Sequence, residues 1–194
     1  MKIKRFCIVS FLAGALFCIG SPAFVSAQSA PAGEYKIGDT GPAGGIVFYD
    51  KRVVTNGWRY MEAAPFDLGP VQWAVNFSKV RFSGSGFGAG TGKANTQRIV
   101  PVLKELGEEG AALLCAELDI NGYTDWFLPS RDELDLMYKN LKAKGRGGFG
   151  SDRYWSSSSS SAEVLLEYYQ QFDNGKTSNQ DSRNLYLVRA CRQF

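Results

Sequence analysis

The sequence predicts an α+β fold in which strands near both ends of the chain flank helices in the middle. Residue patterns typical of strands, rich in aromatic and β-branched residues, occur at 44–50 and again between 154 and 192. Between 95 and 141, apolar residues recur at helical spacing. The 22 glycines and the 13% of aromatic residues favour a fold rich in loops and strands.

The composition excludes several kinds of chemistry. The 194 residues include four cysteines and no histidine. Ser-His-Asp and Cys-His catalysis, histidine-ligated zinc and an imidazole switch near neutral pH are therefore excluded. The length suggests one domain, and the 44% of hydrophobic and 21% of charged residues are typical of a globular protein.

The first 27 residues are typical of a cleaved signal peptide. Lys2, Lys4 and Arg5 precede an apolar run over 6–19, and small residues follow up to Ala27. We expect export to the periplasm, the cell surface or the medium, with a linker over 28–34, a single domain over 35–194 and no transmembrane span in the mature chain. The alternatives are a retained anchor or a lipoprotein that uses Cys18.

Cleavage would change the charge and the cysteine count. The formal charge of +3 belongs to the first 27 residues, so 19 Lys+Arg and 19 Asp+Glu would remain. No basic tract is left, and nucleic acid is not an expected partner. Cys115 and Cys191 would be the two remaining cysteines, and pairing is expected in an oxidising compartment. Such a bond would contribute about 4 kcal/mol, with two free thiols as the alternative.

The first predicted elements form a turn and a hairpin. We interpret 38–44, which resembles two collagen triplets, as turn chemistry before a strand at 44–50. Asn56-Gly57 then predicts a hairpin with a second strand over 58–63. The glycine-rich segment 83–92 lacks the residues of a phosphate-binding loop, so we expect a flexible surface loop there.

Helices are predicted in the middle of the chain. One begins near Asn95 or Thr96, with Pro101 in its first turn or at a kink. A second covers 108–118, and its apolar stripe includes Cys115. Ser130 and Glu133 form a capping box for a third helix, which ends before the glycines of 145–150. Its first-turn acids, which could be read as paired catalytic carboxylates, are more simply explained by the helix dipole.

Strands of an antiparallel sheet are predicted near the C-terminus, at 154–156, 166–172 and 186–192, with a hairpin turn at 173–175. The alternation at 186–192 favours a central strand. The serine run 156–161 is interpreted as a loop, and its hydroxyls have no nearby general base to make them nucleophiles.

Three segments carry a resemblance to a known family. They are Gly-Tyr-Thr-Asp-Trp-Phe-Leu-Pro-Ser-Arg-Asp-Glu-Leu at 122–134, Tyr-Trp-Ser-Ser-Ser at 154–158 and Val-Arg-Ala-Cys-Arg at 188–192. Together with Gly-Gly-Ile-Val-Phe-Tyr at 44–49, this order resembles the C-terminal domain family of bacterial collagen-like adhesins, the Lcl C-terminal domain. The resemblance covers roughly residues 35–194.

The resemblance implies a C-type-lectin-like fold, in which a small twisted antiparallel sheet carries two main helices and long loops. It also implies a disulfide from the first helix to the last strand, and Cys115 and Cys191 occupy matching positions. Family members are exported and are associated with adhesion and with binding to sulfated glycans. The collagen stalk and the calcium motifs of sugar-binding lectins are absent from this sequence, so we expect no metal and no cofactor.

The expected function is that of an exported, non-enzymatic binding module at the cell surface, with a glycan or a protein as its ligand. Its loop-rich face would include 156–161 and 174–184. Candidate contacts are Trp155, Tyr168, Gln170, Asn174, Lys176, Asn179, Gln180 and Arg183. For each, ordinary packing or a solvated loop is the alternative, and for Trp155 the core is favoured. A local basic face could come from Arg153, Lys176, Arg183 and Arg192.

Two other classes of function remain open. The first is a structural or variable-display surface protein, for which the polar segment 174–184 would be the display surface. The second is an enzyme related to formylglycine-generating oxidases, which share the lectin-like fold and need a reactive cysteine pair near the C-terminal end. This chain has only Cys191 there. The sequence carries no signal for an oligomeric state.

Overall fold

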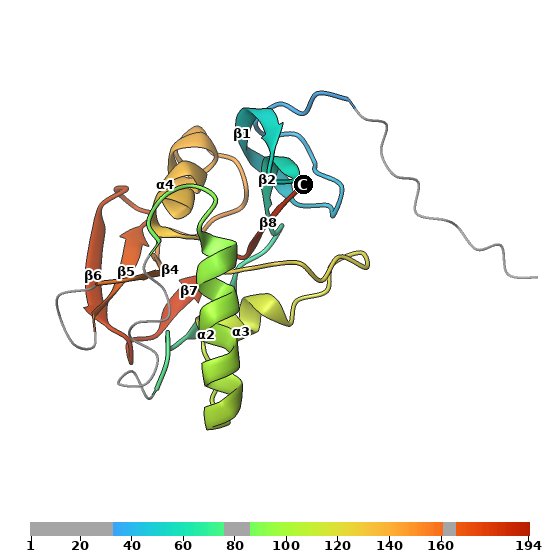
Figure 1. Ribbon diagram of the computed structural model, residues 1–194. Helices are drawn as coiled ribbons and strands as arrows, with labels where there is room; N and C mark the ends of the chain where they lie inside the picture. Colours follow the sequence, from blue (N-terminus) through green and yellow to red (C-terminus); the bar gives the residue numbers. More distant parts are fainter. Residues whose placement is uncertain (1–32, 76–85, 161–165) are drawn as a thin grey trace, which may run out of the picture. The chain divides into compact units, whose positions relative to one another are not determined.

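The computed structural model describes residues 33–75, 86–160 and 166–194 (Figure 1). All of them belong to one unit, Pro31–Phe194. The predicted signal peptide at 1–27 and most of the predicted linker lie outside the described residues. The predicted α+β class is confirmed, but the described residues form two sheets and three α-helices, where we expected one sheet and two main helices.

The smaller sheet joins the beginning of the domain to the end of the chain. Its order is β1-β2-β8, with antiparallel strands β1 (Ile46–Thr55), β2 (Trp58–Ala63) and β8 (Cys191–Gln193). The predicted hairpin is confirmed. Asn56 and Gly57 both have positive φ, 52° and 79°, which a tight two-residue hairpin turn requires.

The predicted turn before β1 is held by a buried carboxylate. Glu62 on β2 accepts hydrogen bonds from the backbone N–H groups of Ala43, at 3.2 Å, and Gly45, at 2.9 Å. A side chain on Gly45 would collide with this carboxylate and with the carbonyl of Ala63, so only glycine lets the turn approach β2 so closely.

The larger sheet has the order β3-β7-β4-β5-β6. Its strands are β3 (Leu68–Val71), β4 (Arg153–Ser159), β5 (Leu166–Gln171), β6 (Thr177–Asp181) and β7 (Tyr186–Val188). Pairing is antiparallel except between β4 and β7, where Tyr154 and Leu187 form a parallel pair. The edge strands β3 and β6 were not predicted.

The prediction of one central strand over 186–192 was wrong. This segment divides into β7 and β8, which belong to different sheets (Figure 1). The break lies at Arg189 and Ala190. The buried guanidinium of Arg189 donates hydrogen bonds to Asp67 Oδ1 at 2.7 Å and to the carbonyls of Ala64 and Gly147 at 2.9 and 2.7 Å. These bonds tie the break to two loops, the connection between β2 and β3 and the glycine-rich loop before β4.

The interpretation of the serine run as a loop was also wrong, because Ser156–Ser159 belong to the buried strand β4. The hydroxyls act as hydrogen-bond partners inside the protein. Ser156 Oγ donates to the carbonyl of Tyr168, Ser158 Oγ donates to that of Gly86, and Ser157 Oγ accepts from the Asn95 amide. The small serine side chains therefore satisfy buried polar groups of β5, of α2 and of the loop at Gly86.

The helices are α2 (Gly92–Leu106), α3 (Ala111–Ala116) and α4 (Arg131–Asn140), followed by a short 3₁₀ turn, η1 (Lys142–Lys144). α2 begins earlier than predicted, so Pro101 lies inside it and not in its first turn. α3 is shorter than the predicted 108–118. The capping box is confirmed: Ser130 Oγ accepts from the N–H of Glu133, whose carboxylate accepts from the N–H of Ser130. No helix in the described ranges is long and apolar enough to cross a membrane.

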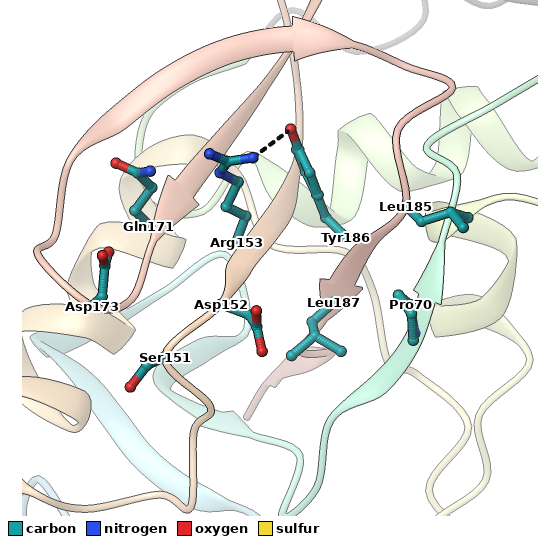
Figure 2. A pocket seen from close by; sticks show the side chains of 9 residues that line it. All are labelled: Pro70, Ser151, Asp152, Arg153, Gln171, Asp173, Leu185, Tyr186 and Leu187. Carbon is teal, nitrogen blue, oxygen red and sulfur yellow. Dashed lines mark hydrogen bonds between the residues drawn. The ribbon is translucent and has the colours of Figure 1, made fainter.

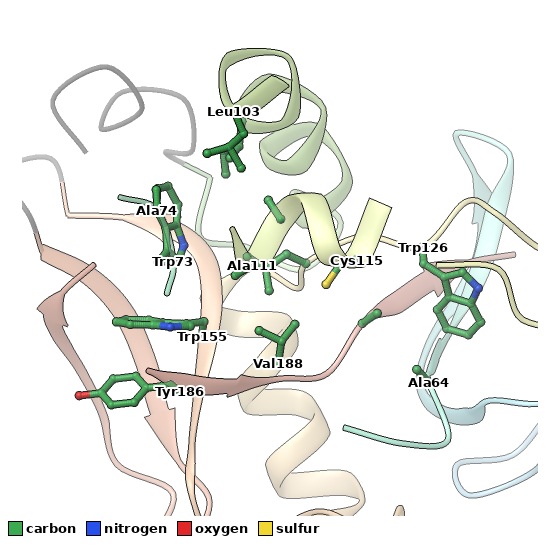
Figure 3. Packing of buried hydrophobic residues seen from close by; sticks show 14 of the residues in the cluster. Ala64, Trp73, Ala74, Leu103, Ala111, Cys115, Trp126, Trp155, Tyr186 and Val188 are labelled. Atoms are coloured by element: carbon green, nitrogen blue, oxygen red, sulfur yellow. The ribbon is translucent and has the colours of Figure 1, made fainter. Parts of the chain in front are cut away.

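Two apolar cores lie on opposite faces of the larger sheet. The first packs α2 and α3 against Trp73, Trp155 and Tyr186 (Figure 3). The second packs α4 against Tyr154 and Phe172, together with residues of the smaller sheet. Side chains alternate along the strands, so neighbouring residues of β5 reach different cores.

Candidate ligand-binding cleft between α4 and β5

A cleft of about 380 Å³ lies where the first turns of α4 meet strands β5 and β6. Arg131, Asp132 and Asp135 line it from the helix, and Tyr168 and Thr177 line it from the strands. Two residues that are far apart in sequence, Asp135 and Tyr168, therefore contribute to one surface. The cleft combines an aromatic ring, a guanidinium, two carboxylates and a hydroxyl.

Helical spacing puts the charged residues on one side of α4. The capping box starts the helix at Arg131, and Asp135 follows one turn later, so the two lie on the same face. Leu134 and Met137 point into the core. Tyr168 lies on the α4 face of β5, whereas Tyr169 belongs to the core on the other face.

The aromatic part of the cleft is held by Phe87 and Arg131. The Phe87 ring meets the Tyr168 ring edge-on, with centroids 5.5 Å apart and an interplanar angle of 87°. The Arg131 guanidinium lies 4.6 Å from the Phe87 centroid and 5.6 Å from that of Tyr168. Arg131 Nε also lies 2.9 Å from Asp132 Oδ1. These contacts restrict both the ring and the guanidinium.

Asp135 is fixed from two sides. The Gln170 amide donates to Asp135 Oδ1 at 2.9 Å, and Lys139 Nζ lies 2.6 Å from Asp135 Oδ2. The hydrogen bond from Lys139 to Asp135 raises the pKa of the lysine. Gln170 is buried and also donates to the carbonyl of Gly175 at 3.0 Å. The predicted contact Gln170 is therefore a positioning residue behind the cleft.

The glycine-rich loop is anchored to α4 over its described part, 86–92, contrary to the expectation of a flexible surface loop. Glu133 Oε1 accepts from the N–H groups of Gly90, at 2.7 Å, and Gly92, at 3.3 Å. The carbonyl of Phe87 accepts from the N–H of Asp132 at 3.0 Å. Burial raises the pKa of Glu133 to about 7. Phe87 is thereby positioned at the cleft.

The other predicted contacts lie at different places around β6. Asn179 pairs with Tyr168 across the sheet and shares its face, while Gln180 pairs with Glu167 on the opposite face. Asn174 and Lys176 are exposed in the turn between β5 and β6. Arg183 lies beyond the far end of β6, where its Nε is 2.9 Å from Asp181 Oδ1.

Trp155 was a candidate contact for which the core was favoured, and its complete burial confirms the core position. Its indole nitrogen donates to the carbonyl of Val71 at 3.0 Å, and its ring centroid lies 4.4 Å from that of Tyr186. Figure 3 shows the indole between Trp73 and Tyr186. Trp155 belongs to the core, because its strand position faces α2 and α3, and it is not part of the cleft.

Cys115 on α3 and Cys191 on β8 are completely buried and are free thiols in the structure. Burial raises the pKa of both thiols. Cys115 belongs to the first apolar core and Cys191 to the second. The disulfide between them stays a prediction.

Of the five residues that line the cleft, the sequence analysis named only Tyr168 as a ligand contact; it assigned no ligand to Arg131, Asp132, Asp135 or Thr177. A signal existed for the helix, because residues 131, 132 and 135 share one face at the start of a capped helix. No cluster of three or more metal-ligating side chains occurs within the described ranges. Comparison of the sequence with protein-family models and with curated proteins finds no match.

Proposed function

We propose that the protein is an exported, non-enzymatic binding module that recognises a neutral glycan at the cell surface through the cleft between α4 and β5. The observation that carries this proposal is the combination, in one cleft, of the Tyr168 ring with the charged groups of Arg131, Asp132 and Asp135. The fold would be C-type-lectin-like, similar to the C-terminal domains of bacterial collagen-like adhesins.

The chemistry of a sugar matches this lining. A pyranose ring has an apolar face that stacks on an aromatic ring, which Tyr168 would provide. Its hydroxyls both donate and accept hydrogen bonds, so they can donate to the carboxylates of Asp132 and Asp135 and accept from the guanidinium of Arg131. The cleft volume of about 380 Å³ lies in the range of sites that enclose small ligands.

The charges around the cleft favour a neutral sugar over a sulfated one. Arg131 is paired with Asp132, and Lys139 is paired with Asp135, so positive and negative groups balance locally. The basic face that the sequence left open does not include Arg192, which is buried and paired with Glu62 and Asp125. A polyanionic ligand would gain little attraction here.

The position of the chain ends supports the lectin-like proposal. β2, near the start of the domain, pairs with β8 at the end of the chain. The rings of Tyr35 and Phe194 also meet edge-on, with centroids 5.2 Å apart. In such a fold the N- and C-terminal strands lie together, as β2 and β8 do here.

A glycan array followed by calorimetry on the purified chain without residues 1–27 tests the proposal. We expect a neutral glycan to bind, and Tyr168→Ala and Asp135→Asn to weaken that binding at least tenfold. Gln180→Ala is the matched control, because it removes an exposed polar side chain from the opposite face of the same strand pair. Binding that survives both cleft substitutions, or the absence of any glycan ligand, would refute the proposal.

A further inference from the structure

A second pocket lies on the other side of the larger sheet, where β4, β5 and β7 come together. Its volume is about 500 Å³, and Figure 2 shows the nine side chains that line it. Arg153 and Gln171 form a cross-strand pair on this face, opposite to the face that carries Tyr168. The pocket is therefore separate from the cleft of the proposed function.

Arg153 presents an oriented cation to this pocket. Its guanidinium lies 5.6 Å from the ring centroid of Tyr169 and 5.5 Å from that of Tyr186, and it donates to Tyr186 Oη at 3.5 Å (Figure 2). The side chain is exposed, and no carboxylate of the described residues lies within ion-pair distance of it. The aromatic contacts orient the guanidinium and leave donors free for a ligand.

Two acids line the same pocket and are also unpaired. Asp152 and Asp173 are exposed, and neither has an ion-pair partner among the described residues. Elsewhere in the described chain, Asp50, Asp67, Asp125 and Asp181 each pair with an arginine. The pocket therefore presents one guanidinium and two carboxylates, which are complementary to a zwitterionic ligand.

The remaining wall is apolar. Leu185 is 62% exposed, and it lines the pocket together with Pro70 and Leu187. Figure 2 shows these three side chains grouped at the side of the pocket away from Asp173. Covering such a wall with an apolar side chain would remove its surface from water, which is favourable. The ligand should therefore carry a hydrophobic group besides its two charges.

We propose that this pocket binds a short, hydrophobic free peptide. The terminal carboxylate would accept hydrogen bonds from Arg153, the hydrophobic side chain would pack on Leu185 and Leu187, and the terminal ammonium would lie against Asp152 or Asp173. Guanidinium and carboxylate match in geometry, which makes this end of the ligand the more specific one. Binding at this pocket is independent of glycan recognition at the cleft.

Calorimetry with the dipeptide Leu-Leu tests the inference, using the purified chain without residues 1–27. We expect saturable binding that weakens at least tenfold when the peptide is N-acetylated or when its carboxylate is converted to an amide. Arg153→Gln and Leu185→Ser should each weaken binding at least tenfold. Both residues are exposed, so the variants should unfold at the same urea concentration as the wild type.

Two control variants locate the binding. Arg183→Gln removes an exposed arginine outside the pocket, and Tyr168→Ala alters the other cleft; neither should change the peptide affinity by more than twofold. If Tyr168→Ala abolishes peptide binding, the assignment to this pocket is wrong. The inference also fails if Leu-Leu does not bind, if the capped peptides bind equally well, or if Arg153→Gln has no effect.

A longer peptide that ends in Leu-Leu distinguishes a free peptide from the end of a protein chain. More residues separate its ammonium from its carboxylate than in the dipeptide, so with the carboxylate at Arg153 we do not expect the ammonium to lie at Asp152 or Asp173. We expect it to bind at least tenfold more weakly than the dipeptide, and Asp173→Asn should reduce this difference. Equal affinity of the two peptides would overturn the assignment of the acids.

Discussion

Arg192 and Glu62 form an ion pair in the interior, with Arg192 Nη1 at 2.8 Å from Glu62 Oε1 and the Glu62 side chain fully buried. Arg192 Nε also donates to Asp125 Oδ1 at 2.7 Å. Since Glu62 holds the turn before β1, this arginine connects the last strand to the first hairpin and to the loop before α4.

Replacing Arg192 should therefore be costly. Arg192→Met would leave Glu62 buried without its cation, and we expect a loss of about 3–5 kcal/mol in the free energy of unfolding. Urea titration measures this loss. Arg183→Gln breaks an exposed pair with Asp181 and should cost at most about 1 kcal/mol. Similar losses in the two variants would contradict the structural role assigned to Arg192.

Glu167 predicts a pH dependence of stability. Its carboxylate is fully buried and has no hydrogen bond of good geometry within the described ranges; burial raises its pKa from 4.5 to about 9, against a smaller lowering by the nearby Ser159 hydroxyl. The folded protein therefore keeps a proton that the unfolded chain releases above about pH 4.5. The contribution of Glu167 is complete below that pH, and it is lost as the pH rises through 9. Urea midpoints between pH 5 and 9.5 should fall with pH, and Glu167→Gln should flatten this decline and stabilise the protein at pH 9.

Glu133 should respond in the opposite way to the same substitution. Burial raises its pKa to about 7, but its oxygens accept hydrogen bonds from the N–H groups of Ser130, Gly90 and Gly92. A glutamine amide nitrogen cannot accept a hydrogen bond, so Glu133→Gln leaves at least one buried donor unsatisfied. We expect a loss of about 1–3 kcal/mol at pH 7, measured by urea titration. A gain in stability would show that the loop contacts of Glu133 are unimportant.

Two glycines of the same loop should differ in their tolerance of alanine. A Cβ on Gly92 would collide with the Glu133 carboxylate and lie 2.7 Å from Ser130 N and 2.9 Å from Leu128 O. Gly92→Ala should therefore lower the thermal midpoint, although alanine normally stabilises a helix relative to glycine. Gly88 has open space around its Cβ position, so Gly88→Ala should change the midpoint little. Equal effects would argue against the packing of Glu133 on this loop.

Thiol titration tests the predicted pairing of Cys115 and Cys191. If the bond forms, the denatured, unreduced protein without residues 1–27 should show no reactive thiols, and prior reduction should reveal two. Two reactive thiols without reduction would refute the disulfide. In that case the native protein should still react slowly at pH 8, because burial raises the pKa of both thiols and removes them from solvent.

Local signals predicted the elements that depend on neighbouring residues. The hairpin at Asn56-Gly57 and the capping box at Ser130 were both confirmed, because the residues that define them lie within four positions of each other. The edge strand β6 was missed because Thr177–Asp181 contains only polar residues and has no apolar alternation. Short β3 was missed because its only strand partner, β7, is more than 110 residues away in sequence.

Only one residue that lines the candidate cleft was predicted as a contact, because the cleft depends on contacts between distant parts of the chain. Tyr168 was named as a candidate contact, and in the structure it lines the cleft. Asp132 and Asp135 were interpreted through the dipole of their own helix in preference to a pair of catalytic carboxylates, and Arg131 was given no role. Their role depends on the docking of α4 onto β5, and no local pattern encodes that contact. Trp155 is the opposite case. The serine run that follows it was interpreted as a loop, but both belong to the buried strand β4.

Because the segment 186–193 divides into β7 and β8, it limits when either sheet can be completed during synthesis of the chain. Neither sheet has all its strands until residues 186–193 are present, since β7 joins β3 to β4 and β8 covers the edge of β2. A nascent chain that still lacks these residues keeps both sheets incomplete. Both sheets can therefore be completed only after residues 186–193 have been synthesised.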